Sequence, residues 1–354
     1  MSKYFSSKYS QLTPYTPGEQ PQDMVYTKLN TNECPFPPSE KAMEYLYKNL
    51  RPLNLYSDPQ MDELRKILAE TYDITPDMLC INNGSDESLN FAFMAFCDEN
   101  RPAVFADITY GFYPVFADLN KIPYEIIPLE EDFSIDPKKY MGLNKTIFIA
   151  NPNAPTGKIL PVSTIEEIVK SNPEGVVIID EAHVDFGGES SIGLTKKYDN
   201  VMVIQTFSKS RSLAGGRLGF AAACPALIQD LNTIRYSTNP YNINSMTAAA
   251  GIGTLKDPEY TKQCCNTIIE NRAYLAEELK KRGFEFPESV ANFIFAKSPK
   301  IDGGELYRKL KEKGVLVRHF DKVTICQYNR ITIGTKQQLD VLLAKIDEIM
   351  EEMQ

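Results

Sequence analysis

Two apolar segments of this chain lead into charged side chains. The segment 176–180 (VVIID) ends in Asp180, which Glu181 follows, and the segment 201–205 (VMVIQ) is soon followed by Lys209. Such runs of Val and Ile are typical of strands that are buried on both faces of a parallel sheet. Because a charge beside a buried strand is costly without a partner, we expect the acid and the amine to meet one ligand.

An acid and an amine at these places have a joint chemistry. Ligands of open α/β sheets bind at the carboxyl ends of the strands, where Asp180, Lys209 and Asn151 are expected to lie. An amine can attack a carbonyl to form a Schiff base, and an acid can keep a pyridine nitrogen protonated, which makes the ring an electron acceptor. Together these two roles predict a pyridoxal phosphate site.

The phosphate of such a cofactor requires an anion site. The segment 82–88 (NNGSDES) predicts one, because a Gly-Ser-Asp turn that enters a helix offers free backbone N–H groups and the positive end of the helix. Hydroxyls and a guanidinium near the lysine would add further contacts, from Thr206, Ser208 and Arg217. Each of these features is common by itself, and the prediction rests on their combination.

The surrounding pattern predicts the elements that position these groups. Short apolar runs alternate with segments whose apolar residues recur three and four apart; the runs are 103–107, 146–151, 176–180, 201–205 and 218–223. This alternation is typical of a mostly parallel sheet between helices. Residues 51–254 are therefore predicted to form the large, cofactor-binding domain of an α/β protein.

The remaining residues predict two further units. A long helix should start at Asp257 and end before Gly283, and it is followed by strands at 293–297, 314–320 and 330–334 and by helices near 303–313 and 336–352. We predict that 255–354 form a smaller α+β domain together with 29–50. Residues 1–28 are polar and rich in proline, which favours an N-terminal arm.

The composition excludes several classes of protein. The chain has 354 residues, of which 43% are hydrophobic and 24% charged, and its net charge of −9 argues against a nucleic-acid partner. No apolar run is long enough to span a membrane, and the first residues lack the apolar centre of a signal peptide, so we expect a cytoplasmic protein without a membrane partner. Seven scattered cysteines without a C-x-x-C pair, and only two histidines, give no sign of a metal site.

A resemblance to a known family extends over nearly the whole chain. It rests on LTPY (12–15), LNTNECP (29–35), LNLYSDPQ (53–60), NGSDE (83–87), TYGFY (109–113), NPNAPTG (151–157), DEAHVDF (180–186), TFSKSRSLAGGRLGF (206–220), PYNINS (240–245), VLVRHF (315–320) and RITIG (330–334). The chain resembles the fold-type I pyridoxal-phosphate aminotransferases of class II, and most closely the histidinol-phosphate aminotransferases. The resemblance implies a seven-stranded, mostly parallel sheet, pyridoxal 5'-phosphate as the cofactor, and a homodimer.

The resemblance also implies roles for single residues. Lys209 is then the Schiff-base lysine and the base that moves the substrate proton, Asp180 pairs with the pyridinium, and Tyr110 stacks on the ring. Tyr56 is similar to a tyrosine that reaches the phosphate from the other subunit. The implied phosphate contacts are Gly84, Ser85, Asp86, Thr206, Ser208 and Arg217.

Two positions depart from the pattern of the family. Ala154 stands where the family usually has an asparagine, and His183 stands where it usually has a tyrosine; both usual residues bind the phenolic oxygen of the cofactor ring. An unpartnered phenolate would change the electronics of the cofactor. We therefore expect Asn153 and His183 to bind that oxygen instead.

Two arginines indicate the substrates. Arg330 begins the segment 330–334 and matches the arginine that binds the α-carboxylate of glutamate, which a guanidinium can hold with two hydrogen bonds. Arg318 matches an arginine that binds the phosphate of histidinol phosphate, and it could equally bind the side-chain carboxylate of glutamate. Tyr15 and Asn32 match other positions of the substrate pocket.

Three functions remain open from the sequence. The first is reversible amino transfer between histidinol phosphate and 2-oxoglutarate or glutamate, a step of histidine biosynthesis. The alternatives are an aromatic amino acid aminotransferase and a lyase similar to threonine-phosphate decarboxylase. A pyridoxal-binding domain of a transcription regulator fits less well, because such a protein needs a helix-turn-helix segment and basic charge.

Overall fold

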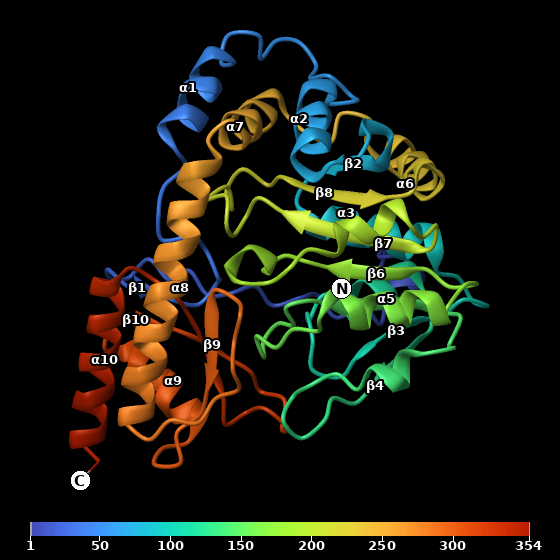
Figure 1. Ribbon diagram of the computed structural model, residues 1–354. Helices are drawn as coiled ribbons and strands as arrows, with labels where there is room; N and C mark the ends of the chain where they lie inside the picture. The colour runs from blue at the N-terminus through green and yellow to red at the C-terminus, as the bar shows by residue number, and fades with distance from the viewer. Residues whose placement is uncertain (1, 354) are drawn as a thin grey trace.

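The computed structural model describes residues 2–353 and contains a seven-stranded sheet with helices on both faces (Figure 1). The strand order is β2-β8-β7-β6-β5-β3-β4, and β8 runs antiparallel to its neighbours while the other paired strands are parallel. This arrangement confirms the predicted mostly parallel α/β fold. The strands are β2 (Leu79–Asn82), β3 (Ala103–Ala106), β4 (Tyr124–Ile127), β5 (Thr146–Ala150), β6 (Val177–Asp180), β7 (Val201–Thr206) and β8 (Gly219–Ala223).

The central strands are buried on both faces, which explains their nearly continuous apolar sequences. In β7, Val201 and Val203 face one hydrophobic core, and Met202 and Ile204 face the other, because successive side chains of a strand point to opposite faces. The first core includes α2 (Asp62–Tyr72), α5 (Val162–Ser171) and α7 (Ser245–Leu255), and the second includes α3 (Ser85–Phe96), α4 (Tyr113–Asn120) and α6 (Pro225–Thr238).

The C-terminal segment has a sheet and a core of its own, at the lower left of Figure 1. Its three-stranded antiparallel sheet has the order β11-β12-β9. Leu29 also belongs to this core, which α8, α9 and α10 cover. The elements are α8 (Pro258–Lys281), β9 (Phe293–Ala296), α9 (Gly303–Glu312), β10 (Val315–Leu316), β11 (Arg318–His319), β12 (Asn329–Thr332) and α10 (Lys336–Glu351).

The single strand predicted for 314–320 is instead two short strands. β10 pairs in parallel with β1 (Thr27–Lys28), and β11 pairs antiparallel with β12. The two halves of the apolar segment therefore have different neighbours, one of which comes from the other end of the chain. A sequence pattern reports burial but not the partner of a strand, so this division was not predictable from the segment alone.

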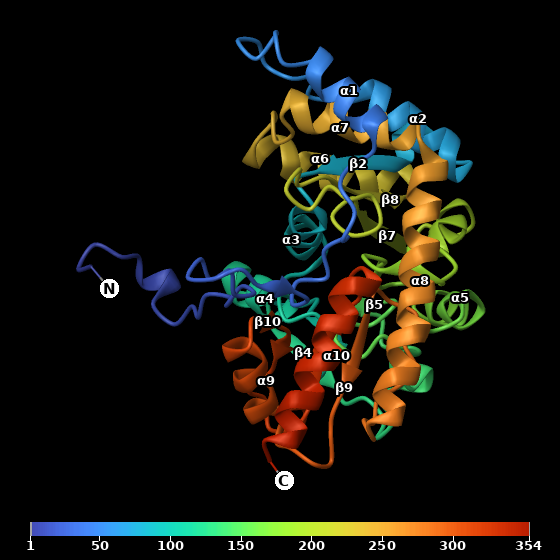
Figure 2. The same ribbon diagram turned by 90° about the vertical axis from the view of Figure 1, so that its left-hand side faces the viewer.

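The N-terminal segment joins both parts of the molecule. The first of its described residues, from Ser2 on, extend away from the rest of the chain (Figure 2), and they include a short 3₁₀ helix, η1 (Ser7–Tyr9). Helix α1 (Glu40–Lys48) lies against α7, and its Tyr45 and Leu46 pack on the core of the large sheet, while Leu29 packs in the C-terminal core. The division of the chain into the predicted domains, including 29–50, stays a prediction.

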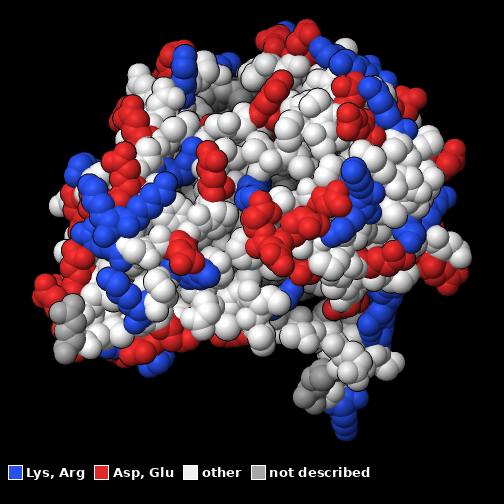
Figure 3. Space-filling view, turned by 60° about the horizontal axis from the view of Figure 1, so that its bottom comes forward, with Lys and Arg blue, Asp and Glu red and all other residues white. Residues whose placement is uncertain are grey.

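The surface carries charges of both signs. Figure 3 shows Asp and Glu side chains interspersed with Lys and Arg on the face turned toward the viewer. Within residues 2–353, no helix is both long enough and apolar enough to cross a membrane.

Candidate active site

The carboxyl ends of three central strands meet at one cavity. Asp180 is the last residue of β6 and lies beside Ala150, the last residue of β5, while Lys209 follows the end of β7 by three residues. The cavity has a volume of about 680 Å³. Thirteen predicted site residues line it: Tyr15, Asn32, Ser85, Asp86, Tyr110, Asp180, His183, Thr206, Ser208, Lys209, Arg217, Arg318 and Arg330.

Lys209 presents a buried amine to this cavity. Its Nζ donates a hydrogen bond of 2.9 Å to the carbonyl oxygen of Thr31. Burial, and next the positive charge of Arg330, lower the pKa of Lys209 to about 8. A substantial fraction of the amine is therefore uncharged near neutral pH, which a nucleophile or a base requires.

Asp180 is a buried carboxylate opposite this amine. Its Oδ2 accepts a hydrogen bond from the hydroxyl of Tyr113 at 3.0 Å, and its Oδ1 accepts one from the backbone N–H of Ala182 at 3.2 Å. Burial raises the pKa of Asp180 to about 6, and these two hydrogen bonds oppose the increase. A cationic nitrogen in the cavity would stabilise the ionised form.

A candidate anion site lies at the start of α3. Gly84 precedes the helix with a φ of 80°, and a Cβ at this position would lie 2.5 Å from Nη2 of Arg217. The N-cap residue Gly84 offers no side-chain hydrogen bond to this end of the helix, and the first helical residues, Ser85 and Asp86, line the cavity, so free N–H groups of the first turn are available to an anion there. The hydroxyls of Thr206 and Ser208 lie 3.0 Å apart, and Arg217 donates to the second at 3.2 Å.

Aromatic side chains form one wall of the cavity. The hydroxyl of Tyr110 donates to Oδ1 of Asp86 at 2.7 Å, which fixes its ring beside the anion site. Tyr15 of the N-terminal segment packs on Phe112 with ring centroids 4.2 Å apart. A planar ligand therefore finds a flat aromatic surface next to both Asp86 and Asp180.

Two arginines on neighbouring strands complete the cavity. Arg318 in β11 is directly opposite Arg330 in β12. Burial lowers the pKa of Arg330 to about 10, its Nη2 donates to the carbonyl oxygen of Asn30 at 3.1 Å, and its Nε has no hydrogen-bond partner among residues 2–353. Arg318 donates to the carbonyl oxygens of Thr16 and Pro17 at 3.2 and 3.4 Å. An anionic substrate would satisfy the free donor of Arg330.

Comparison with known proteins decides the family. Residues 25–346 match the model of the family described as aminotransferase class I and II. This chain belongs to the class I and II aminotransferases. Family membership confirms the predicted enzyme class and its cofactor, pyridoxal 5'-phosphate, which these enzymes use to transfer amino groups.

Individual relatives agree with this family. The aminotransferase is 47% identical to a histidinol-phosphate aminotransferase of Brachyspira hyodysenteriae, over 99% of this chain and 100% of the relative. It is similar to the crystal structure of a histidinol-phosphate aminotransferase from Sinorhizobium meliloti in complex with pyridoxal-5'-phosphate, with a TM-score of 0.91, 20% identity and coverage of 100% and 99% of the two chains. An L-threonine-O-3-phosphate decarboxylase from Porphyromonas gingivalis has the same fold, with a TM-score of 0.79, 19% identity and coverage of 93% and 100%. The fold alone therefore does not separate amino transfer from decarboxylation.

The residues of the aminotransferase fit pyridoxal 5'-phosphate. Lys209 and Asp180 supply an amine and a carboxylate on one cavity, and the uncapped start of α3 with Arg217 supplies the anion site. The φ of 80° at Gly84 is a conformation that only glycine adopts without strain, which explains the glycine at this turn, and a Cβ there would also displace Arg217. The roles of the single residues stay predictions.

Asn153 does not lie on the cavity. Its Nδ2 donates to the carbonyl oxygen of Ile108 at 2.9 Å and to Thr156 at 3.1 Å, and its Oδ1 accepts from Thr109 at 2.8 Å. Both amide hydrogens are thus engaged in holding neighbouring loops together. In this arrangement Asn153 has no amide hydrogen left for the cofactor's phenolic oxygen, and its contact with that oxygen stays a prediction.

His183 does line the cavity and remains a candidate. Its Nδ1 lies 2.9 Å from Oδ1 of Asn292, whose Nδ2 donates to the carbonyl oxygen of Asn32. Because that amide oxygen can only accept, Nδ1 carries the proton. Burial lowers the pKa of His183 well below its ordinary value, so the neutral imidazole offers Nε2 only as an acceptor, which could pair with a protonated ring hydroxyl but not with the phenolate.

Tyr56 lies outside the cavity. Its side chain is 82% exposed, and its ring stacks on that of Tyr241 with centroids 4.4 Å apart. Within one chain, Tyr56 therefore has no contact with the predicted phosphate site, and its role depends on a second copy of the chain.

Three residues near the site were not predicted. The backbone oxygen of Thr31 binds Lys209, Glu33 lines the cavity, and Tyr113 binds Asp180. All three lie in the segments 29–35 and 109–113, which carry part of the family resemblance. Their proximity to the site depends on how the N-terminal segment and α4 pack, which residue types do not reveal.

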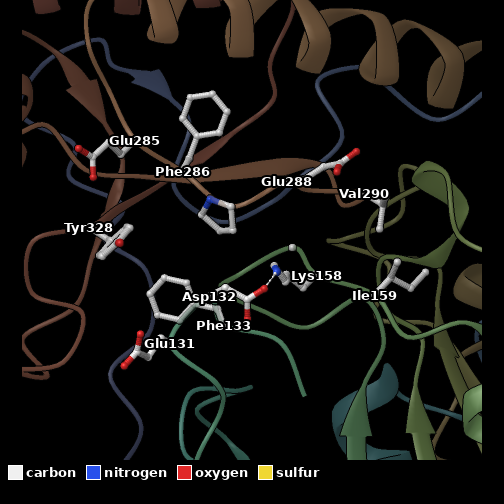
Figure 4. A pocket seen from close by; sticks show the side chains of 12 residues that line it. Glu131, Asp132, Phe133, Lys158, Ile159, Glu285, Phe286, Glu288, Val290 and Tyr328 are labelled. Atoms are coloured by element: carbon white, nitrogen blue, oxygen red, sulfur yellow. Dashed lines mark hydrogen bonds and ion pairs between the residues drawn. The ribbon is translucent and has the colours of Figure 1, made fainter. Parts of the chain in front are cut away.

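A second hollow of about 560 Å³ lies between residues 131–133 and 157–159 on one side and 285–290 on the other (Figure 4). Lys158 is paired there with Asp132, and the remaining charged groups are carboxylates. It contains neither Asp180 nor Lys209, so the chemistry of the aminotransferase belongs to the cavity at the strand ends.

Proposed function

We propose that this aminotransferase transfers an amino group reversibly between histidinol phosphate and 2-oxoglutarate, as a step of histidine biosynthesis. The observation that carries the proposal is that Arg318 and Arg330, which are opposite each other on neighbouring strands, line the same cavity as Lys209. The name of the Brachyspira hyodysenteriae relative supports the choice of substrate.

The residues of the cavity have separate roles in holding the cofactor. Pyridoxal 5'-phosphate, when bound, supplies a carbonyl group and a ring that accepts electrons. Lys209 would hold it at the aldehyde, Asp180 at the ring nitrogen, and Arg217 with the start of α3 at the phosphate. When it is free, the amine of Lys209 accepts and returns the proton of the substrate carbon at Nζ, and its pKa of about 8 suits this exchange near neutral pH.

The two arginines suit two different substrates. Histidinol phosphate carries a phosphate and no carboxylate, whereas glutamate carries two carboxylates. Arg330, with its free Nε, would bind the α-carboxylate of glutamate, and Arg318 would bind the phosphate of one substrate and the distal carboxylate of the other. Tyr15 and Asn32 line the same part of the cavity and would complete the substrate pocket.

The visible spectrum of the purified protein tests this proposal. We expect a yellow absorbance that histidinol phosphate bleaches at lower concentration than phenylalanine or threonine phosphate, and that 2-oxoglutarate restores. Bleaching mainly by phenylalanine would indicate an aromatic amino acid aminotransferase. Carbon dioxide release from threonine phosphate would indicate a lyase and overturn the proposal.

The second copy of the chain and the location of the enzyme belong to the same proposal. Exposed apolar side chains gather near the predicted contact, at Leu53, Leu55, Tyr56 and Tyr241, and support a homodimer in which Tyr56 reaches the phosphate of the partner. All seven cysteines are free thiols, which favours a reducing compartment such as the cytoplasm. Cell fractionation tests the location.

A further inference from the structure

Tyr113 is a buried tyrosine that touches the site without lining its cavity. It is the first residue of α4, and its side chain has no exposed surface. Its hydroxyl donates to Oδ2 of Asp180 at 3.0 Å. Among residues 2–353, it is the only side chain that donates a hydrogen bond to this carboxylate, since the other donor is the backbone N–H of Ala182.

The direction of this hydrogen bond is fixed. Burial, and next the negative charge of Asp180, raise the pKa of Tyr113 well above its ordinary value. The phenol therefore keeps its proton at any pH at which the protein functions. Because Tyr113 can only donate here, Asp180 must accept, which favours the ionised carboxylate.

The ring of Tyr113 is held in place from several sides. It packs against Phe105 and Phe148 with centroids 5.7 Å away in both cases. It also makes a T-shaped contact with Tyr110, with ring centroids 5.7 Å apart and an interplanar angle of 85°. One side chain thus contacts both the acid of the site and the aromatic residue of its wall, and its hydroxyl has little freedom to move.

We propose that Tyr113 is a positioning residue that keeps Asp180 ionised and turns its free lone pairs toward the ring nitrogen of the cofactor. This inference rests on the proposed binding of pyridoxal 5'-phosphate. Without the hydroxyl of Tyr113, the carboxylate is a stronger base. A more basic Asp180 would draw the proton that it shares with the ring nitrogen toward itself. The ring nitrogen would then be less protonated, and the ring would accept electrons less readily.

Other charged groups face Asp180 as well. Asp86 from α3 disfavours its negative charge, and Lys209 favours it. Tyr110, the other phenol nearby, gives its hydrogen bond to Asp86. None of these groups replaces the donor that Tyr113 provides, so its removal should have a measurable effect.

The test compares Tyr113→Phe with Tyr140→Phe. Tyr140 is a matched control, because it is equally buried and its hydroxyl has no hydrogen-bond partner among the described residues. Each protein is reconstituted with pyridoxal 5'-phosphate labelled with ¹⁵N in the ring, and both the dissociation constant and the ¹⁵N chemical shift are measured.

We expect Tyr113→Phe to weaken cofactor binding on the order of tenfold and to move the ¹⁵N signal toward that of neutral pyridine. Tyr140→Phe should leave both values as in the unaltered protein. In an Asp180→Asn background, Tyr113→Phe should change the ¹⁵N signal no further, because the charge through which it acts is gone.

A second variant covers the case in which Tyr113→Phe does not fold. 3-Fluorotyrosine at position 113 nearly keeps the shape of the ring and makes the hydroxyl a stronger donor, so the ¹⁵N signal should move in the opposite direction. An unchanged signal in both variants would overturn the role of Tyr113. Failure of the unaltered protein to bind the cofactor would instead overturn the proposed function.

Discussion

The charge of Arg330 should control the reactivity of Lys209. With a pKa of about 8, roughly one tenth of the Lys209 amine is uncharged at pH 7, whereas an ordinary lysine has about 0.03% in that form. Arg330 itself stays protonated near pH 7, since burial lowers its pKa only to about 10. The structure thus accounts for an increase in free amine of about 300-fold.

Replacing Arg330 by Gln removes the second largest cause of the lowered pKa and leaves the largest, burial, in place. We expect the pKa of Lys209 to rise by roughly one unit, which lowers the uncharged fraction at pH 7 about tenfold. Arg330→Lys is the matched control, because it keeps the positive charge and loses the planar fork that binds a carboxylate with two hydrogen bonds.

The assay is the rate at which the cofactor-free protein captures pyridoxal 5'-phosphate, followed by visible absorbance between about pH 6 and pH 10. The unaltered protein and Arg330→Lys should reach half of the maximal rate near pH 8, and Arg330→Gln at a higher pH. An identical midpoint for Arg330→Gln would refute the role of the arginine. A midpoint above about pH 10 in the unaltered protein would refute the role of burial as well.

Three further predictions concern the phosphate, the substrate and the dimer. Gly84→Ala should weaken binding of pyridoxal 5'-phosphate at least tenfold but change binding of pyridoxal little, because the new Cβ displaces Arg217; equal losses for both ligands in equilibrium titrations would contradict this reasoning. Arg318→Gln should raise the KM for histidinol phosphate on the order of tenfold or more and leave the KM for phenylalanine nearly unchanged, as steady-state kinetics would measure; a uniform increase would place Arg318 outside substrate recognition. Inactive Lys209→Ala mixed in equal amount with a Tyr56→Phe protein of low activity should regain about a quarter of the unaltered activity after subunit exchange. About half of the dimers are then mixed, and each mixed dimer has one intact site of two. No gain after confirmed exchange would show that Tyr56 serves its own chain.

The sequence by itself determined the fold class and the chemistry of the site. Nearly continuous apolar runs are typical of strands buried on both faces, and two of them lead into Asp180 and Lys209. Since parallel strands end at the same edge of a sheet, the two groups had to meet. The resemblance of the segment 206–220, together with the other motifs, to those of a known family then indicated the family.

Only the tertiary structure decided which neighbouring groups act on these residues. The sequence predicted that Asn153 and His183 together bind the phenolic oxygen, but Asn153 uses both amide hydrogens on Ile108 and Thr156, while His183 lies on the cavity. From the sequence, Tyr113 could not be distinguished from the other aromatic residues of 109–113. The packing of α4 places its hydroxyl against Asp180. Contacts between segments far apart in the chain depend on packing, which the periodicity and the residue types of a sequence do not report.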